Sequence, residues 1–284
     1  MGKLGETFKE EGYAGCGDNL MENKNDLGGT FDTAVSLYEK MRPGYVGDIY
    51  KAIFDYVDIG ESSRVVEVGS GSGQATLPVL QTGCSLTAVE YGENFSGLLR
   101  DKFGGYEKFR VVTGKFEDVP LENDTYDLVF SATAFHWVPE DIGYPKVYSI
   151  LKEGGAFARF ANRPQISRDD PELLREIDEI YDGHYNKYYG VRSGTRKWFT
   201  EESARAIADI PAKYGFTDIR YHLFRRDRTF TAGEYVQLLG TYSDHIAIEE
   251  SERKVFFGKI EDAIERHGGM ITINDTLDLE LARK

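Results

Sequence analysis

The sequence is poor in cysteine and in long apolar runs. Its only two cysteines, Cys16 and Cys84, form neither a Cys-x-x-Cys pair nor a disulfide framework, so we expect two free thiols and no metal centre. No segment approaches the roughly 18 consecutive apolar residues of a membrane span. The first ten residues lack the apolar stretch of a signal peptide. The sequence therefore predicts a cytoplasmic protein that uses neither a membrane nor a metal.

Clustered basic residues are also scarce. The chain has 34 lysines and arginines against 48 aspartates and glutamates, a formal net charge of -14. A surface that binds nucleic-acid phosphates normally needs clustered Lys and Arg. The runs at 192–197 and 225–228 are too short for that, and we interpret them as solvated faces, with attraction of a small carboxylate as a weaker alternative. The composition thus argues against a nucleic-acid partner.

Glycine, in contrast, is concentrated at one informative place. Residues 65–68 read as a buried strand, which ends in a turn containing Gly69, Gly71 and Gly73 and then opens a helix. Open α/β sheets bind ligands at such turns. Glycines let the backbone approach a ligand closely, and the following helix N-terminus offers unpaired N–H groups. We therefore expect a polar ligand here.

The spacing of this turn discriminates between ligands. A dinucleotide turn reads G-x-G-x-x-G, but Gln74 stands where the third glycine belongs, and Glu67 precedes Gly69 by two residues. An NAD-dependent oxidoreductase is therefore disfavoured. The pattern E-x-G-x-G-x-G resembles motif I of the class I S-adenosylmethionine-dependent methyltransferases. The resemblance implies that Glu67 approaches the methionyl end of the cofactor and that the glycines pass beneath it, although a ligand-free turn needs similar residues.

A second acidic residue supports this interpretation. Residues 85–90 read as the next parallel strand, which Glu90 ends. A carboxylate at that position can accept hydrogen bonds from both ribose hydroxyls of a nucleotide. The alternative is an exposed carboxylate near a helix start. With motif I upstream we favour ribose binding, with Tyr91 beside it.

The order of the remaining elements also matches the family. Strands are expected at 109–112, 126–131, 218–224 and 270–281, and residues 151–158 read as a helix end, a Gly-Gly turn and the start of a fifth strand. The Y-D-L-V fourth strand, with Ser131 at its end, and the L-K-x-G-G turn resemble the family patterns. The resemblance, covering about 31–284, implies an α/β Rossmann-like fold with a seven-stranded, mostly parallel sheet. Its last strand runs antiparallel between the fifth and sixth.

One motif departs from the family. Gly114, Lys115 and Phe116 stand where many relatives carry Gly-Asp-Ala, whose aspartate lies near the adenine amine. Two roles for Phe116 remain open: it packs on the adenine while Glu117, Asp118 or a backbone group meets the amine, or it belongs to the core.

Two further segments resemble a subgroup of methyltransferase type 11 proteins that includes trans-aconitate methyltransferase. Residues 38–45, the lid segment, match Y-x-x-x-R-P-x-Y, which implies that Tyr38, Arg42 and Tyr45 lie across the cofactor pocket. The alternative is that Arg42 caps a helix while the tyrosines pack. Residues 239–243 match L-x-T-Y-S, which implies that Tyr242 faces the acceptor.

Aromatic residues are dense between the fifth and sixth strands. We favour core packing for most of them and an acceptor-pocket role for one or two, with Trp198 the candidate. After the fourth strand comes Phe-His-Trp, whose Trp137 is a second pocket candidate. His136 is either a general base or a structural partner of Trp137. A base is optional, because in-line displacement on a sulfonium methyl mainly needs positioning and exclusion of water.

These expectations define an organisation and an activity. We expect an N-terminal arm and lid helices at 1–61, a Rossmann-like cofactor core at 62–162, a helical cap insertion at 163–215 and the rest of the sheet at 216–284. The predicted enzyme transfers a methyl group from S-adenosyl-L-methionine to a small molecule, releases S-adenosyl-L-homocysteine, and is a monomer or homodimer. The alternative is a cofactor-binding regulatory or assembly protein that has this fold and no transfer activity.

Overall fold

The computed structural model describes residues 35–191 and 198–284. The expected arm at 1–30, Cys16 and the basic run at 192–197 lie outside these ranges. Within them, Cys84 is a buried free thiol, and no helix has the length and apolar character that crossing a bilayer requires.

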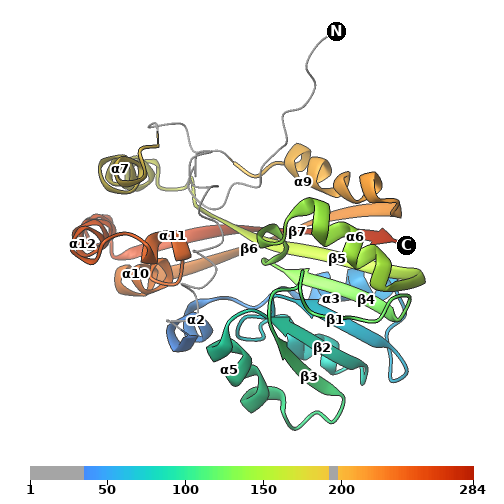
Figure 1. The fold of residues 1–284 in the computed structure, drawn as a ribbon. Helices are drawn as coiled ribbons and strands as arrows, with labels where there is room; N and C mark the ends of the chain where they lie inside the picture. The colour runs from blue at the N-terminus through green and yellow to red at the C-terminus, as the bar shows by residue number, and fades with distance from the viewer. Residues whose placement is uncertain (1–34, 192–197) are drawn as a thin grey trace.

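A seven-stranded sheet forms the centre of the molecule (Figure 1). Its strand order is β3-β2-β1-β4-β5-β7-β6, and β7 runs antiparallel to both β5 and β6 while the first five strands are parallel. This confirms the predicted fold. The strands are β1 (Arg64–Val68), β2 (Ser85–Glu90), β3 (Phe109–Thr113), β4 (Tyr126–Ala132), β5 (Leu151–Ile166), β6 (Thr217–Thr231) and β7 (Met270–Arg283).

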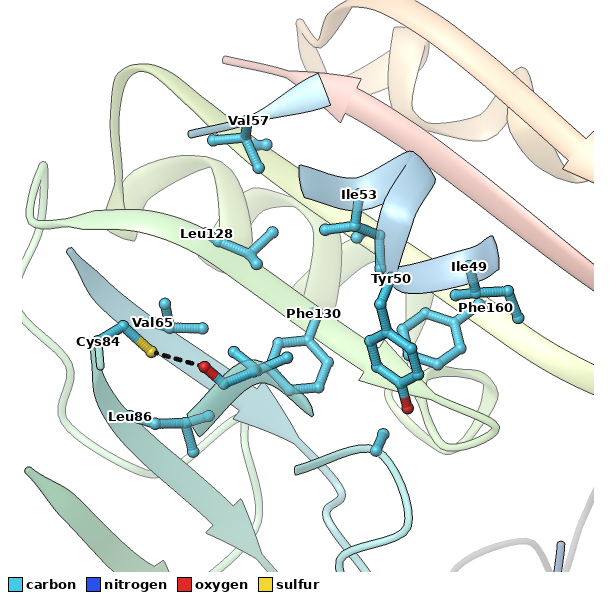
Figure 2. Close-up of a cluster of buried hydrophobic side chains, with 14 of the residues drawn as sticks. Ile49, Tyr50, Ile53, Val57, Val65, Cys84, Leu86, Leu128, Phe130 and Phe160 are labelled. Atoms are coloured by element: carbon cyan, nitrogen blue, oxygen red, sulfur yellow. Dashed lines mark hydrogen bonds between the residues drawn. The ribbon is translucent and has the colours of Figure 1, made fainter. Parts of the chain in front are cut away.

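The central strands are buried on both faces because helices cover both. Strands β1, β2 and β4 are therefore nearly continuous apolar runs, as parallel strands usually are. Figure 2 shows that Ile49, Tyr50 and Ile53 of helix α3 (Gly47–Tyr56) pack against β4 and β5. The helices around this part are α2 (Val35–Met41), α3 (Gly47–Tyr56), α4 (Thr76–Leu80), α5 (Glu93–Phe103) and α6 (Glu140–Ile150), with a 3₁₀ turn η3 (Phe135–Trp137) before α6.

Strands β5, β7 and β6 extend beyond the others and carry the cap. Two separate segments build this cap, because α7 from the predicted insertion packs on α12 from the C-terminal part (Figure 1, left). Its buried core includes Tyr181, Tyr185, Phe256 and Ile260. The cap consists of α7 (Pro171–Tyr181), the π-helix η4 (Asp182–Asn186), α8 (Lys187–Tyr189), α10 (Ala232–Leu239), α11 (Ser243–Ile246) and α12 (Glu250–Arg266), whereas α9 (Glu201–Ala208) and η5 (Ile210–Tyr214) pack near β6.

Three helices begin at capping side chains. The Asp170 side chain accepts a hydrogen bond from the Leu173 N–H at the start of α7, and Thr200 caps α9 in the same way. Thr231 and Glu234 form a capping box at the start of α10. Such caps typically contribute about 0.5–2 kcal/mol each, because they satisfy N–H groups that the helix leaves unpaired.

The interpretation of 225–228 as a solvated face is wrong for two of its arginines. Arg226 and Arg228 both pair with Asp275 of β7, at 2.8 and 2.6 Å, and this carboxylate is 1% exposed. Arg225 and Asp227 are exposed. Because successive side chains of a strand point to opposite faces, the run alternates between a buried ion-pair cluster and solvent.

Candidate functional site

The glycine-rich turn after β1 needs its glycines for different reasons. All three have positive φ, at 71° for Gly69, 53° for Gly71 and 82° for Gly73. A Cβ at Gly69 would lie 2.4 Å from the Ala134 Cβ, and one at Gly73 would lie 2.4 Å from the Phe103 ring. Core packing therefore excludes side chains at these two positions. Gly71 instead faces the lid: the nearest atom to its Cβ position belongs to the Tyr38 ring, at 3.8 Å.

Glu67 is a buried carboxyl that has no cationic partner in the described structure. It is 1% exposed, and its Oε2 accepts a hydrogen bond from the Thr76 hydroxyl at 2.7 Å, whereas Oε1 has no hydrogen-bond partner. Burial raises the pKa of Glu67 to about 8, although the nearby Thr76 and Ser70 hydroxyls oppose this rise. Glu67 is therefore mostly protonated at neutral pH and would ionise if a cation were bound beside it.

Two hydroxyls near Glu67 also lack partners. Tyr50 of α3 and Ser70 of the turn are 6% and 5% exposed, and neither hydroxyl makes a hydrogen bond. Burial raises the pKa of Tyr50 well above its ordinary value, and the neighbouring Tyr45 and Glu67 raise it further. An unsatisfied buried polar group costs about 1–3 kcal/mol. Three such groups around one turn therefore fit a site that a polar ligand completes.

Glu90 fixes the turn from the end of β2. Its Oε2 accepts a hydrogen bond from the Gly71 N–H at 2.7 Å, and its Oε1 accepts one from the Gly92 N–H at 2.8 Å. Each carboxylate oxygen has a second lone pair, so these bonds leave room for ribose hydroxyls. Tyr91 is 49% exposed beside it, with the Lys115 Nζ 5.6 Å from its ring centre.

The candidate adenine residues lie mostly in the protein interior. Phe116 is 3% exposed, packs 6.5 Å from the Phe135 ring centre and lies under the Lys146 Nζ at 5.0 Å. Its position therefore favours the core role of the two left open. The half-buried Glu117 offers its carbonyl to Lys146 at 3.0 Å. The Ser131 hydroxyl donates to the Val68 carbonyl at 2.8 Å, so this residue ties β4 to β1.

The lid segment is joined to the cap by Arg42. Its Nε and Nη2 donate to the hydroxyl and the carbonyl of Thr241, both at 3.0 Å. Its guanidinium also lies 5.0 Å from the Tyr38 ring centre and 4.3 Å from that of Tyr242. The two sequence segments with subgroup resemblance therefore meet, and Tyr38 brings both next to Gly71.

Tyr45 joins the same lid segment to the end of β4. Its hydroxyl lies 2.7 Å from the Thr133 Oγ1, and its ring meets Phe160 edge-on at 4.8 Å. Burial raises the pKa of Tyr45 well above its ordinary value, so the hydroxyl stays neutral at physiological pH. Thr133 has a φ of 54°, which β-branched residues rarely adopt. Strain of this kind often lies at functional sites.

Comparisons with known proteins agree with this geometry. The methyltransferase type 11 family model, described as a methyltransferase domain, matches residues 66–158. An uncharacterised methyltransferase of Schizosaccharomyces pombe is 25% identical over 230 residues, 80% of this chain and 84% of that protein. Ribosomal RNA small subunit methyltransferase A of Borrelia garinii subsp. bavariensis is 31% identical over 219 residues, 74% of this chain and 78% of that protein. The chain belongs to the class I S-adenosylmethionine-dependent methyltransferases.

Solved structures share the methyltransferase fold. A protein of Anaeromyxobacter dehalogenans named as a type II methyltransferase aligns with a TM-score of 0.59 at 18% identity, covering 85% of this chain and 97% of that one. Haemonchus contortus phosphoethanolamine N-methyltransferase 2, in complex with phosphomonomethylethanolamine and S-adenosylhomocysteine, aligns with a TM-score of 0.53 at 14% identity. This second alignment covers 94% of this chain and 59% of the Haemonchus chain.

In this methyltransferase the Phe-His-Trp segment forms the turn η3, directly after β4. The ring centres of His136 and Trp137 are 4.9 Å apart, and both side chains are partly exposed. Ala134, just before this turn, occupies the space that a Gly69 side chain would need. The loop that carries His136 therefore packs directly on motif I.

The aromatic residues of the cap mostly pack, as expected. The Tyr181 hydroxyl lies 3.0 Å from the Nε2 of the buried His245, and the Tyr185 hydroxyl donates to Asp244 at 2.7 Å. Trp198 instead stacks on Arg168, at 3.7 Å, near the junction of β5 and α7. No contact of Trp198 with the motif I turn is seen, so its place in the acceptor pocket stays a prediction.

Sequence reasoning missed the small polar partners of this site. The hydroxyls of Thr76, Thr133 and Thr241 form hydrogen bonds with Glu67, Tyr45 and Arg42, respectively. Only Thr241 carried a signal, because it belongs to the L-x-T-Y-S segment. Tyr50 gave none, because its spacing on α3 reads as an ordinary buried helix position.

Proposed function

We propose that this methyltransferase binds S-adenosyl-L-methionine over the motif I turn and transfers its methyl group to a small molecule. The unsatisfied atoms Glu67 Oε1, Ser70 Oγ and Tyr50 OH carry this proposal. An α-amino acid end group has an ammonium that needs an acceptor and a carboxylate that needs donors. One carboxyl oxygen and two hydroxyls meet both needs, so the chain's own residues fit the methionyl end of the cofactor.

The remaining cofactor contacts follow from the same placement. Glu90 would accept hydrogen bonds from the ribose hydroxyls, beside Tyr91. Gly69 and Gly73 would keep the turn in shape, and Gly71 would let the cofactor pass between the turn and Tyr38. The adenine would lie toward Glu117. The product left in this site is S-adenosyl-L-homocysteine.

The chemical step needs mainly position and a dry pocket. The bound cofactor supplies an activated sulfonium methyl group. Arg42 and Tyr45 hold the lid segment against the cap and the end of β4, which excludes water from the pocket. Trp137, Trp198 and Tyr242 would line the acceptor side. His136 would accept the proton that a hydroxyl or amine acceptor loses, since the loop that carries it packs on the motif I turn.

A small-molecule acceptor is favoured by charge. The net charge of -14 repels phosphates, and Asp275 neutralises part of the basic run on β6. The name of the Haemonchus structure supports a small acceptor, whereas the name of the Borrelia relative makes structured RNA the second candidate. A monomer or homodimer that binds no nucleic acid stays our expectation.

Calorimetry followed by a transfer screen tests the proposal. S-adenosyl-L-homocysteine should bind and NAD should not. Transfer from S-adenosyl-L-methionine labelled in its methyl group should then be measured with 4-nitrophenol, benzylamine, phenylacetate, a hydroquinone and an RNA hairpin. Failure to bind S-adenosyl-L-homocysteine overturns the cofactor site. Binding without transfer to any acceptor favours the regulatory or assembly alternative, and transfer to the hairpin alone favours RNA.

A further inference from the structure

Strand β5 runs farther than its neighbour β4. The last residues paired between them are Ala132 and Phe160, whereas β5 stays paired with β7 as far as Ile166 and Ile273. Within the described ranges, residues 161–166 therefore pair with a strand on one side only, beyond the carboxyl end of β4. Figure 1 shows β5 next to β4 in the sheet. Ligands of open α/β sheets bind at this end.

The backbone of Asn162 is fixed where β5 passes the end of β4. Its N–H donates to the Thr133 Oγ1 at 3.2 Å, and that oxygen also bonds the Tyr45 hydroxyl. Asn162 follows Phe160 by two residues and so shares its face of the strand. Because the Phe160 ring contacts Tyr45, this face is the one that the lid segment covers.

The side chain of Asn162, unlike its backbone N–H, has an atom without a hydrogen-bond partner. Its Oδ1 is sealed from solvent and has no hydrogen-bond partner among the described residues. An unpaired buried amide is destabilising. If packing alone were required, a leucine of similar size would fill the space without that penalty.

The amide is separate from the groups assigned to the cofactor. Glu67 and Ser70 belong to β1 and its turn, whereas Asn162 belongs to β5, and β4 lies between these strands. The third group, the Tyr50 hydroxyl, belongs to α3, whose Tyr50 ring lies 6.2 Å from that of Phe160. The Tyr45 and Thr133 hydroxyls beside Asn162 already bond each other. Among the described residues, the Asn162 Oδ1 is therefore a buried polar atom of β5 that still lacks a partner.

We propose that the amide of Asn162 anchors the methyl acceptor and selects acceptors that carry an O–H or N–H hydrogen at the reacting atom. The proposal rests on the proposed function, because it places the acceptor beside a cofactor bound at motif I. An amide oxygen can only accept a hydrogen bond. A hydroxyl or amine supplies the hydrogen that Oδ1 lacks, whereas a carboxylate has none to give and could meet only the Nδ2 group.

The transfer step balances with Asn162 as a binding group alone. The acceptor oxygen or nitrogen forms a bond to the methyl carbon while the carbon–sulfur bond breaks, and its electron pair stays on sulfur, which becomes a neutral thioether. The acceptor's proton leaves to His136 or to water. Asn162 holds the hydrogen of the acceptor before that step, because a neutral amide does not take up a proton at physiological pH.

Asn162→Leu tests this role, because it keeps the volume and removes the hydrogen bond. The probes are 4-nitrophenol, benzylamine and phenylacetate, with S-adenosyl-L-methionine as donor. We expect the wild-type protein to methylate the phenol or the amine in preference to phenylacetate. Asn162→Leu should lower kcat/KM for that probe about 10- to 100-fold, as expected for one lost buried hydrogen bond. The S-adenosyl-L-homocysteine Kd should stay within twofold and the Tm should be unchanged or higher.

Asn274→Leu is the matched control, because this asparagine lies on β7 of the same extension and donates to the exposed Asp227. It should leave kcat/KM unchanged. Asn162→Asp keeps an acceptor oxygen and should retain more transfer to benzylamine than Asn162→Leu. Phenylacetate as the preferred acceptor, equal activity of Asn162→Leu, or no transfer to either hydrogen-bearing probe would overturn the proposal. If the wild-type protein does not bind S-adenosyl-L-homocysteine, the proposed function itself is refuted.

Discussion

The raised pKa of Glu67 makes cofactor binding pH-dependent in a direction that can be calculated. With a pKa of about 8 the carboxyl is about nine-tenths protonated at pH 7 in the free protein. An ammonium bound at Oε1 favours the charged form, so its arrival should expel the proton. Binding of S-adenosyl-L-homocysteine at pH 7 should therefore release up to about 0.9 proton, and affinity should rise up to about tenfold, or 1.4 kcal/mol, between pH 6 and pH 7.

Isothermal titration calorimetry at these two pH values, in buffers with different ionisation enthalpies, measures both quantities. Glu67→Gln keeps an oxygen that can accept the hydrogen bond from Thr76 but does not titrate. Its affinity should be lower and independent of pH over this range, with no proton release. Glu261→Gln, which changes an exposed carboxylate on α12, should behave like the wild-type protein. A wild-type affinity that is the same at pH 6 and pH 7, without proton release, would refute the ammonium assignment.

The same pKa shift has a consequence for the free protein. The folded-state pKa of Glu67 lies above its unfolded value of about 4.3. Protonation therefore favours the folded state, and this stabilisation is complete below about pH 4 and is lost as the pH rises toward 8. Glu67→Gln should remove that part of the pH dependence, and the difference between variant and wild type in denaturant unfolding should grow from pH 5 to pH 8. Equal differences at both pH values would contradict the buried, cation-free environment of Glu67.

The sequence was sufficient to predict the sheet because its signals are local. Apolar runs that end in glycine or in an acidic residue mark parallel strands, and capping residues mark helix starts. The predicted end of the sixth strand at 224 falls seven residues short, because the charged run 225–228 reads as surface. In the fold those charges meet Asp275, and this pairing across strands leaves no local signal.

The site was predictable to the extent that its residues follow a motif. Glu67 and Glu90 lie at the strand ends where the pattern puts them. What the pattern omits is which hydrogen bonds remain unmade. Tyr50 and Asn162 look like an ordinary core residue and an ordinary strand residue until the surrounding chain leaves their polar atoms without partners. Whether a polar atom lacks a hydrogen-bond partner depends on segments that are far apart in the sequence. The missing hydrogen bonds therefore become visible only in the folded structure.

Three further variants probe the lid, the cofactor and the base. Tyr50→Phe should weaken S-adenosyl-L-homocysteine binding by about 1 kcal/mol yet leave 5′-methylthioadenosine, which lacks the amino acid, unaffected; the Tm should not fall, because the lost hydroxyl has no partner. Arg42→Ala removes two hydrogen bonds and two ring contacts, so S-adenosyl-L-homocysteine affinity should fall about tenfold and hydrogen exchange in α2 should rise. His136→Ala distinguishes a base from a packing residue: loss of a base lowers kcat about 100-fold or more at constant cofactor affinity, whereas loss of packing lowers Tm and affinity together. Full turnover by His136→Ala, on an acceptor that the wild-type protein methylates, would leave positioning by the lid and the strand ends as the source of catalysis.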